Sequence, residues 1–383
     1  MKKEKIPFWR DGKVIAIAGQ VLVVLMLLII LGVLGNNLVR NYQQLNIKFG
    51  FEFLSRPASF DIGNAPISFS STDSFMKALL VGLLNTGRVT IFGIILATGL
   101  GITVGIARLA DNWLVRFLAT VYVETFRNTP LLLQLFCWYF AFFLQLPSIE
   151  NPVIIPGPIF LTNRGLDIPW PAGTTQTWLA LAWVVLSVIF VVILWGRRMK
   201  VIVEKSESGQ LFQGIIIALA LTIIIALVFG LDWRVPQLKE EVIQGGINLS
   251  TEFATLLVGL TVYTAAFIAE VVRAGIQSVN KGQWEAGRAL GLNYSNLMQL
   301  IIFPQALRVM IPPLTSEFLN LTKNSSLAIA TGYSDVYAVS QTTLTQTGKD
   351  IEMVLLVMTT YLTINMITSF TMNWLNRSVQ IKE

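Results

Sequence analysis

The chain is organised as long apolar runs separated by short polar segments. The clearest run extends from Val14 to Leu34, where Gln20 and two glycines are the main interruptions. Because a membrane-spanning helix needs about 20 mostly apolar residues, this run predicts a first span. Further runs of comparable character follow at 79–107, 120–146, 178–195, 211–230, 252–273, 298–322 and 354–375. The pattern predicts an all-α integral membrane protein with about eight transmembrane helices.

The first apolar run follows a basic segment that contains Lys2, Lys3, Lys5, Arg10 and Lys13. A secretory signal peptide has a similar start, but its apolar core is only ~7–15 residues long and ends at a small-residue cleavage site. This core is longer, and the sequence at 34–37, Leu-Gly-Asn-Asn, is a poor cleavage site. We therefore expect an uncleaved first helix.

The composition agrees with a membrane protein and excludes several chemistries. Charged residues make up 13% of the chain, whereas a soluble domain carries roughly 25%. Histidine is absent, which excludes a His-held haem or zinc and any serine or cysteine nucleophile that depends on His. Cys137 is the single cysteine, so an internal disulfide is excluded. We expect neither a metal site nor a catalytic site.

The basic residues indicate the orientation of the chain. If the N-terminus is cytoplasmic, sixteen of the 28 lysines and arginines fall in inside loops, eight fall in outside loops and four fall within spans. Cytoplasmic loops carry an excess of Lys and Arg, so this distribution predicts that both termini are cytoplasmic. The net charge of +6 then reflects membrane topology, and nucleic acid is not an expected partner.

Two long segments fall on the predicted outer side, at 35–78 and 147–177. The second contains six prolines, which fix φ and remove a backbone donor, so it is expected to be an ordered loop rather than a helix. Together these segments are predicted to cap the external face.

The cytoplasmic loop after the sixth span contains a predicted helix over Trp284–Leu290. Asn280 is suited to cap its N-terminus, with Gln283 three residues on, and Gly291 is suited to end it. Small residues at Ala286, Gly287 and Ala289 allow close approach by a partner. The residues alone leave two interpretations open, a docking helix or a surface helix that lies on the membrane.

The spacing in this loop resembles the EAA motif of ABC importer permeases, E-A-A-x3-G-x9-I-x2-P. Glu285-Ala286-Gly287 is followed by Gly291, Ile301 and Pro304 at the motif's intervals, with Gly in place of the second Ala. The resemblance implies that 283–296 is a cytoplasmic coupling helix that docks in a groove on an ATP-binding subunit. The coupling residues it implies are Gln283, Glu285, Ala286, Gly287, Gly291, Ile301 and Pro304.

Three flanking stretches resemble the polar amino acid permeases within that family, and their order along the chain matches. They are Phe126-Arg127-Asn128-Thr129-Pro130-Leu131-Leu132-Leu133-Gln134, Ala269-Glu270-Val271-Val272-Arg273-Ala274-Gly275-Ile276 and Lys323-Asn324-Ser325-Ser326-Leu327. The resemblance implies a type I ABC importer (MetI-like) permease core with extra helices. The core would comprise 79–146 and 250–383, while 1–78 (a helix and external loop) and 147–249 (an external loop and two extra spans) are additions that resemble the general L-amino acid permeases.

The resemblance also implies a function and partners. We expect a permease subunit in the bacterial inner membrane that imports polar L-amino acids by alternating access. Its expected partners are two copies of an ATP-binding subunit that holds ATP and Mg²⁺, a second homologous permease in a heterodimer (or a second copy in a homodimer), an external amino-acid-binding protein, and membrane lipid. The sequence has no G-x4-G-K-[ST] loop, so no cofactor is expected in this chain and ATP hydrolysis would belong to its partner. The alternatives are a secondary transporter driven by an ion gradient, and a membrane enzyme or scaffold.

Ionisable residues inside the predicted spans are candidates for the transport pathway, because each costs ~2.5–3.5 kcal/mol to insert. Glu124 with Arg127, and Glu270 with Arg273, are three residues apart and are expected to pair along one helix face, in a pairing or gating role. An amino acid zwitterion needs an anion for its ammonium group, which Glu270 could supply, and hydrogen-bonding groups for its carboxylate. The remaining pathway candidates are Gln134, Thr322, Lys323, Asn324 and Ser325, of which the last three form a polar run expected to line a cavity or to break the helix.

Overall fold

The computed structural model describes residues 12–44, 49–63, 65–205, 209–239 and 242–379. Within this part of the chain, seven helical segments are long and apolar enough to cross a membrane. Five of them are single helices: α1 (Gly12–Gln44), α2 (Phe75–Ala107), α5 (Thr175–Lys205), α7 (Thr251–Gln277) and α12 (Asp350–Val379). The sixth is α6 (Gln210–Ile225), which continues into the π-helical turn η5 (Ala226–Gly230). The seventh is a continuous segment made of α9 (Tyr294–Leu297), η6 (Met298–Ile302), α10 (Phe303–Asn324) and η7 (Ser325–Thr331). The expected fold class, an all-α integral membrane protein, is confirmed.

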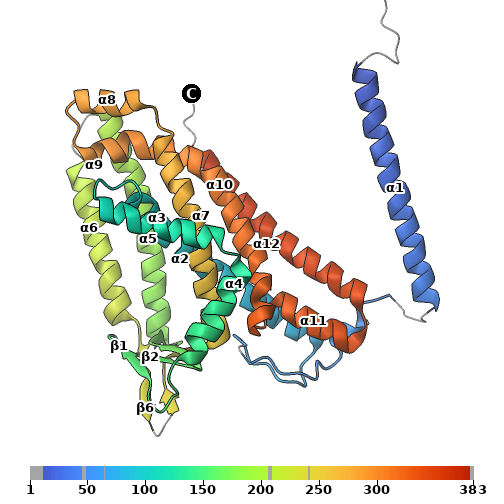
Figure 1. Cartoon of the computed structure of the whole chain (residues 1–383). Coiled ribbons are helices and arrows are strands. Elements are labelled where there is room, and N and C mark those ends of the chain that lie inside the picture. The colour runs from blue at the N-terminus through green and yellow to red at the C-terminus, as the bar shows by residue number, and fades with distance from the viewer. Residues whose placement is uncertain (1–11, 45–48, 64, 206–208, 240–241, 380–383) are drawn as a thin grey trace, which may run out of the picture.

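The run at 120–146, predicted as one span, is divided by Pro130. Helix α3 (Trp113–Asn128) ends before Thr129, which is extended because the residue before a proline is disfavoured in the helical region. A new helix, α4 (Leu131–Phe136), then continues through the π-helical turn η3 (Cys137–Phe142) and the 3₁₀ turn η4 (Phe143–Gln145). In Figure 1, α3 crosses the long helices α2 and α7 rather than running beside them.

The end of α1 and the start of α2 also differ from the prediction. Helix α1 continues to Gln44, so the segment from residue 35 is helical before it becomes a loop. After the short 3₁₀ turn η2 (Glu52–Ser55), the chain enters α2 at Phe75, where the Ser74 hydroxyl accepts a hydrogen bond from the Lys77 N–H. Side chains of this loop pack with the start of α2 and with α11 (Val336–Thr347) in a buried apolar cluster.

Helices α2 and α7 form the centre of the helical core. They approach closely because α2 presents glycines to α7: a Cβ on Gly101 would lie 2.6 Å from the Ile268 side chain, and one on Gly105 would lie 2.7 Å from the Ala269 carbonyl oxygen. Small residues at a helix interface allow this packing in a membrane, where it replaces the hydrophobic driving force between helices. Helix α10 packs on α7 from the side of Met310 and extends the same cluster.

Between α4 and α7 the chain forms a hairpin of two spans, α5 and α6, together with short strands. The strands β1 (Val153–Ile155), β2 (Ile159–Thr162), β3 (Gly165–Ile168) and β8 (Ile247–Ser250) form an antiparallel sheet in that order, while β4 (Trp170–Pro171) pairs with β5 (Trp233–Arg234) and β6 (Gln237–Lys239) with β7 (Val242–Gln244). The proline-rich segment is therefore non-helical, as expected. Its strands pair with strands that follow the hairpin, so the small sheets contain residues from both sides of the two spans.

The two ends of this insertion lie close together. Asn163 donates its N–H to the carbonyl of Pro147, where the insertion begins, at 3.0 Å. Its own carbonyl accepts from the hydroxyl of Thr251, the first residue of α7, at 2.8 Å. The sheet thus lies at the start of α7, and the hairpin extends away from it (Figure 1).

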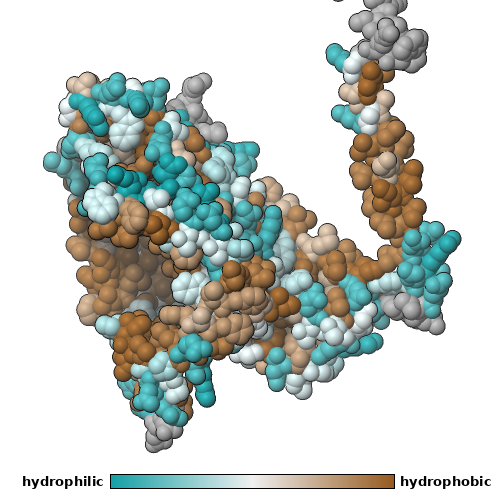
Figure 2. Space-filling view, in the orientation of Figure 1, coloured by the Kyte–Doolittle hydropathy of each residue, from teal (hydrophilic) through white to brown (hydrophobic). Residues whose placement is uncertain are grey.

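The surface divides into apolar and polar regions along the long axis of the helices. Figure 2 shows apolar surface over α1 and over the middle of the molecule, with hydrophilic surface gathered at the end that carries α8 (Lys281–Ala289) and at the tip of the strands. The start of α1 and the end of α12 lie at the same end as α8 (Figure 1).

Candidate functional site

The loop between α7 and α10 folds into a short helix, α8, with a cap at each end. The Asn280 side chain accepts a hydrogen bond from the Gly282 N–H at 2.8 Å, as predicted for the N-cap. At the other end the N–H groups of Gly291 and Leu292 bond to the carbonyls of Arg288 and Gly287, which is the Schellman pattern. Gly291 has φ +72°, a left-handed conformation that side chains rarely adopt.

The expected coupling helix over 283–296 is two helices rather than one. Helix α8 ends at Ala289, and the chain turns at Gly291 before α9 begins at Tyr294. The Asn293 side chain caps α9 by accepting from the Asn296 N–H at 2.8 Å. The glycine and this second cap break the helix within the predicted range.

The seven residues implied by the motif divide into an exposed set and a set that anchors α8. Gln283, Glu285, Ala286 and Gly291 are exposed. Gly287 is buried, and a Cβ there would lie 2.3 Å from the Leu297 side chain and 3.4 Å from that of Ile301. Pro304 is the second residue of α10 and follows directly after the π-helical turn η6.

The departure from the family motif at Gly287 therefore has a physical reason. The absence of a side chain lets α8 lie directly against Leu297 and Ile301, which belong to the segment that leads into α10. The Gln305 side-chain amide also reaches that of Gln283 at 3.3 Å. Helix α8 thus packs directly on the segment that leads into α10.

Two large side chains on this loop were not singled out from the sequence. Leu290 and Tyr294 flank the glycine turn with 77% and 69% of their surface exposed. Leu290 is the C-cap of α8 and Tyr294 opens α9, so the turn between the two helices presents both side chains to the surroundings. The sequence did contain a signal for Leu290. An apolar residue directly before a predicted C′ glycine, in a short polar loop, has no core to cover it and is therefore expected to be exposed.

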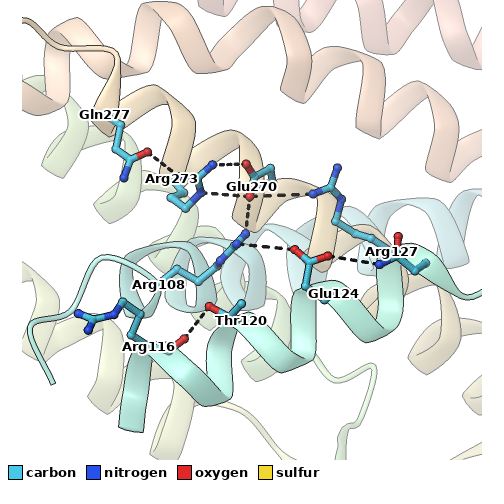
Figure 3. Close-up of polar contacts among 9 residues, drawn as sticks. Arg108, Arg116, Thr120, Glu124, Arg127, Glu270, Arg273 and Gln277 are labelled. Atoms are coloured by element: carbon cyan, nitrogen blue, oxygen red, sulfur yellow. Dashed lines mark hydrogen bonds and ion pairs between the residues drawn. The ribbon is translucent and has the colours of Figure 1, made fainter. Parts of the chain in front are cut away.

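A cluster of charged side chains joins α2, α3 and α7 (Figure 3). Glu270 on α7 is its centre and accepts hydrogen bonds from Arg273 on the same helix and from Arg108 at the end of α2. Arg127 on α3 lies 4.0 Å from the same carboxylate. The predicted pairing of Glu270 with Arg273 is confirmed, but Arg108, whose side chain is only 11% exposed, was missed because the contact joins residues 162 positions apart.

The predicted pairing of Glu124 with Arg127 is wrong. Glu124 lies 3.9 Å from Arg108 and accepts from the Asn128 amide at 3.3 Å. Arg127 turns instead toward α7, over the Phe267 ring at 5.2 Å. Both residues lie on α3, but the anion on α7 attracts the Arg127 guanidinium away from its neighbour.

Arg127 has unused hydrogen-bonding capacity. Its Nε is buried and has no hydrogen-bond partner in the described part of the chain. Its ion pair with Glu270 is long, and Glu317 on α10 lies within electrostatic range. A guanidinium in this position matches the planar, bidentate geometry of a carboxylate.

The remaining pathway candidates lie on α4 and at the junction of α10 with η7. Gln134 is buried and donates to the carbonyls of Phe126 and Thr129, both at 2.9 Å. The hydroxyls of Thr322 and Ser325 are buried and donate to carbonyls of their own helical segment. Lys323 is exposed and Asn324 half-buried, and the α-helix ends at Asn324, as the polar run predicted. In this conformation the polar groups of Thr322 and Ser325 are therefore closed off.

The chain matches one protein family over most of its length and several relatives over nearly its full length. Residues 90–381 match the family described as binding-protein-dependent transport system inner membrane component. The chain is 41% identical to the general L-amino acid transport system permease protein AapQ of Rhizobium johnstonii, over 97% of this chain and 94% of that protein. It is 42% identical to the putative amino-acid ABC transporter permease protein YhdX of Escherichia coli, over 95% and 94%. It is 39% identical to the glutamate/glutamine/aspartate/asparagine transport system permease protein BztB of Rhodobacter capsulatus, over 97% and 95%.

Proposed function

This chain belongs to the family of binding-protein-dependent transport system inner membrane components and is a permease subunit of an amino acid ABC importer, and we propose that its cargo is polar L-amino acids. The family model covers residues 90–381, and three amino acid permeases match almost the full length. This membership contradicts the alternative of a secondary transporter driven by an ion gradient. The geometry of α8, of the helix ends beside it and of the charged cluster supports the proposed partners, orientation and pathway.

The observation that carries the proposed coupling mechanism is the exposure of α8. Its capped ends make it a rigid element, and Gly287 fixes its buried side against Leu297 and Ile301. Its other side exposes Glu285, and the following turn exposes Leu290 and Tyr294. Tyrosine is among the residue types enriched in interface hot spots, and Leu290 extends the exposed apolar surface beside it. A partner ATP-binding subunit is the proposed occupant, and its ATP-driven closure would move α10 through this contact.

The proposed orientation places α8 and the ends of the chain in the cytoplasm. The start of α1 and the end of α12 lie at the end of the molecule that carries α8 (Figure 1), and Arg308 on α10 donates to the carbonyl of Val379 at 3.2 Å. The strands and the loop that precedes α2 then face the outside, where an amino-acid-binding protein would dock. Two ATP-binding subunits and a second permease, homologous or identical, complete the proposed assembly in the inner membrane, with ATP and Mg²⁺ held by the ATP-binding subunits.

The charged cluster is proposed to act as a gate at the cytoplasmic side of the pathway. It ties the end of α2 and the last turn of α3 to α7 through Glu270, so separation of these helices must break ion pairs. Because Glu270 already has arginine partners, it would take a substrate ammonium only after the helices move. Arg127 would meet the substrate carboxylate, and the hydroxyl and amide groups of Gln134, Thr322 and Ser325 would become available as the same helices separate, beside Lys323 and Asn324.

Reconstitution tests the function directly. The chain is expressed with a second permease, an ATP-binding subunit and a binding protein from the same genome. The complex is purified and placed in proteoliposomes with ATP inside and radiolabelled glutamate, glutamine or aspartate outside. Uptake should require ATP and the binding protein together. A matched complex whose ATP-binding subunit cannot hydrolyse ATP should bind the subunits but not transport. Uptake by the permease alone, without an ATP-binding subunit, would overturn the proposal.

A further inference from the structure

The segment between η7 and α11 is fastened to α2 by buried hydrogen bonds. The Asn85 side-chain amide donates to the carbonyl of Ser334 at 2.9 Å, and the Thr86 hydroxyl accepts from the Val336 N–H at 3.0 Å. The Tyr333 hydroxyl donates back to the Asn85 carbonyl at 3.3 Å. The start of α11 therefore depends on its contact with α2 for much of its polar pairing.

Asp335 lies at the centre of this junction and is completely buried. One carboxylate oxygen caps α11 by accepting from the Ala338 N–H at 2.8 Å, and the other accepts from the Tyr361 hydroxyl of α12 at 3.0 Å. In the described part of the chain, no lysine or arginine lies within ion-pair distance of it. A buried carboxylate without a counter-ion is costly, so the closed arrangement favours the neutral acid.

The groups around Asp335 come from several elements. Tyr361 faces it from α12, and Tyr333 faces it from the preceding turn. Arg88 of α2 lies within electrostatic range of Tyr333, and its guanidinium lies over the Phe253 ring at 5.0 Å. Burial raises the pKa of the Asp335 carboxyl to about 6, and the hydrogen bonds from Ala338 and Tyr361 oppose this rise only in part. The carboxyl therefore changes charge close to physiological pH.

The Tyr361 hydroxyl also connects this junction to the proposed pathway. It lies close to Ser325 and Ser326, which follow the point where α10 ends. A movement that separates α12 from Asp335 would therefore also disturb the polar segment after Lys323.

We propose that Asp335 and Tyr361 form a protonation-dependent latch that holds α11 and α12 against α2, and that this latch opens during the transport cycle. Asp335 acts as a positioning residue, because it sets the placement of the helices around the pathway without contacting the substrate. Its role in transport rests on the proposed function, whereas the latch itself depends on the fold alone.

The sign of the pH dependence follows from the buried neutral acid. A carboxyl whose folded-state pKa lies above its unfolded value stabilises the fold at low pH, and this contribution is lost as pH rises through the folded-state pKa. The closed junction should therefore weaken as the pH rises from about 4, near the ordinary pKa of 3.8, to about 6, the raised pKa. A conformation that exposes Asp335 to water gains population over the same interval.

Thermal unfolding of the purified complex as a function of pH tests the latch. The melting temperature of the wild type should fall across this interval, and that of Asp335→Asn, which keeps a capping oxygen but cannot ionise, should not. Tyr361→Phe removes a donor that stabilises the carboxylate, so its transition should move to higher pH. Asp73→Asn is the matched control, because Asp73 pairs with Lys77 near the surface and the pKa of its carboxyl is lowered.

Uptake in proteoliposomes over the same pH range tests the role in transport. The wild type should show a transition in uptake of several-fold, which Asp335→Asn loses and Tyr361→Phe displaces upward. A wild-type melting profile in both variants would overturn the latch. A flattened melting profile in Asp335→Asn with an unchanged uptake profile would overturn its role in transport alone. If no amino acid is transported at any pH, the proposed function fails while the melting data still decide the latch.

Discussion

Arg108 at the end of α2 and Glu270 on α7 form an ion pair that is largely shielded from solvent, with 11% and 25% of the two side chains exposed. Arg273 and Arg127 converge on the same carboxylate, so one anion holds three cations from three helices. The consequence is that Glu270 cannot be neutralised without leaving like charges close together.

Glu270→Gln should therefore impair uptake strongly while the protein still assembles. An unpaired, partly buried charge costs about 2 kcal/mol, between the values for exposed and fully buried pairs. The double variant Glu270→Gln with Arg108→Gln should be less damaging than the sum of the two single changes, since it removes both partners. Uptake and melting temperature are measured together, with Arg116→Gln as an exposed control from the same region. Wild-type uptake in Glu270→Gln would remove this residue from the gate.

At Gly291, the backbone conformation predicts which substitutions are tolerated. With φ at +72°, a β-branched side chain is strained by about 1–2 kcal/mol, whereas Asn adopts this conformation readily. Gly291→Val should uncouple ATP hydrolysis from uptake, and Gly291→Asn should retain both. There is open space around this glycine, so a difference between the variants reports backbone conformation rather than a clash. Equal uptake in both variants would show that the turn does not need this conformation.

The exposed pair at Leu290 and Tyr294 is expected to anchor the ATP-binding subunit. Leu290→Asp and Tyr294→Ala should each lower recovery of that subunit in affinity purification by about tenfold, as expected of interface hot spots. Leu238→Asp is the control, because Leu238 is an exposed leucine on β6, at the opposite end of the molecule. The docking surface lies elsewhere if all three variants recover the subunit equally.

Close packing of α2 on α7 predicts a contrast between two neighbouring glycines. A methyl group on Gly101 would lie 2.6 Å from Ile268, whereas one on Gly99 would meet nothing within 4 Å. Gly101→Ala should destabilise the protein by about 1–3 kcal/mol through overpacking, and Gly99→Ala should be neutral. Melting temperatures in detergent measure the difference. A tolerant Gly101 would mean that the two helices separate easily.

Local features of the sequence predicted local structure well. The caps of α8 follow from Asn280 and Gly291, because an N-cap and a left-handed C′ residue act on the adjacent turn alone. Most spans follow from apolar length, which is a property of a single segment. The break before Pro130 was also available from the proline itself, yet the apolar run on both sides concealed it.

The features that were missed depend on partners far away in the sequence. Arg108 directly follows the predicted span at 79–107, and its bond to Glu270 arises only when α2 lies beside α7. Asp335 caps a helix locally, but its burial comes from Tyr361 and from α2. The strands between the spans are too short to be predicted alone, since β3 is completed by β8 after two intervening helices.

The hydrogen bonds of Asn163 to Pro147 and Thr251 have a consequence for the modularity of the chain. Because the insertion leaves and re-enters the core at neighbouring points, a short linker can join the two halves of the core when the insertion is removed. Within the described residues, α5 and α6 pack mainly on each other, so their loss would uncover little of the core. The two-span hairpin is thus a detachable module, joined to the permease by its strands.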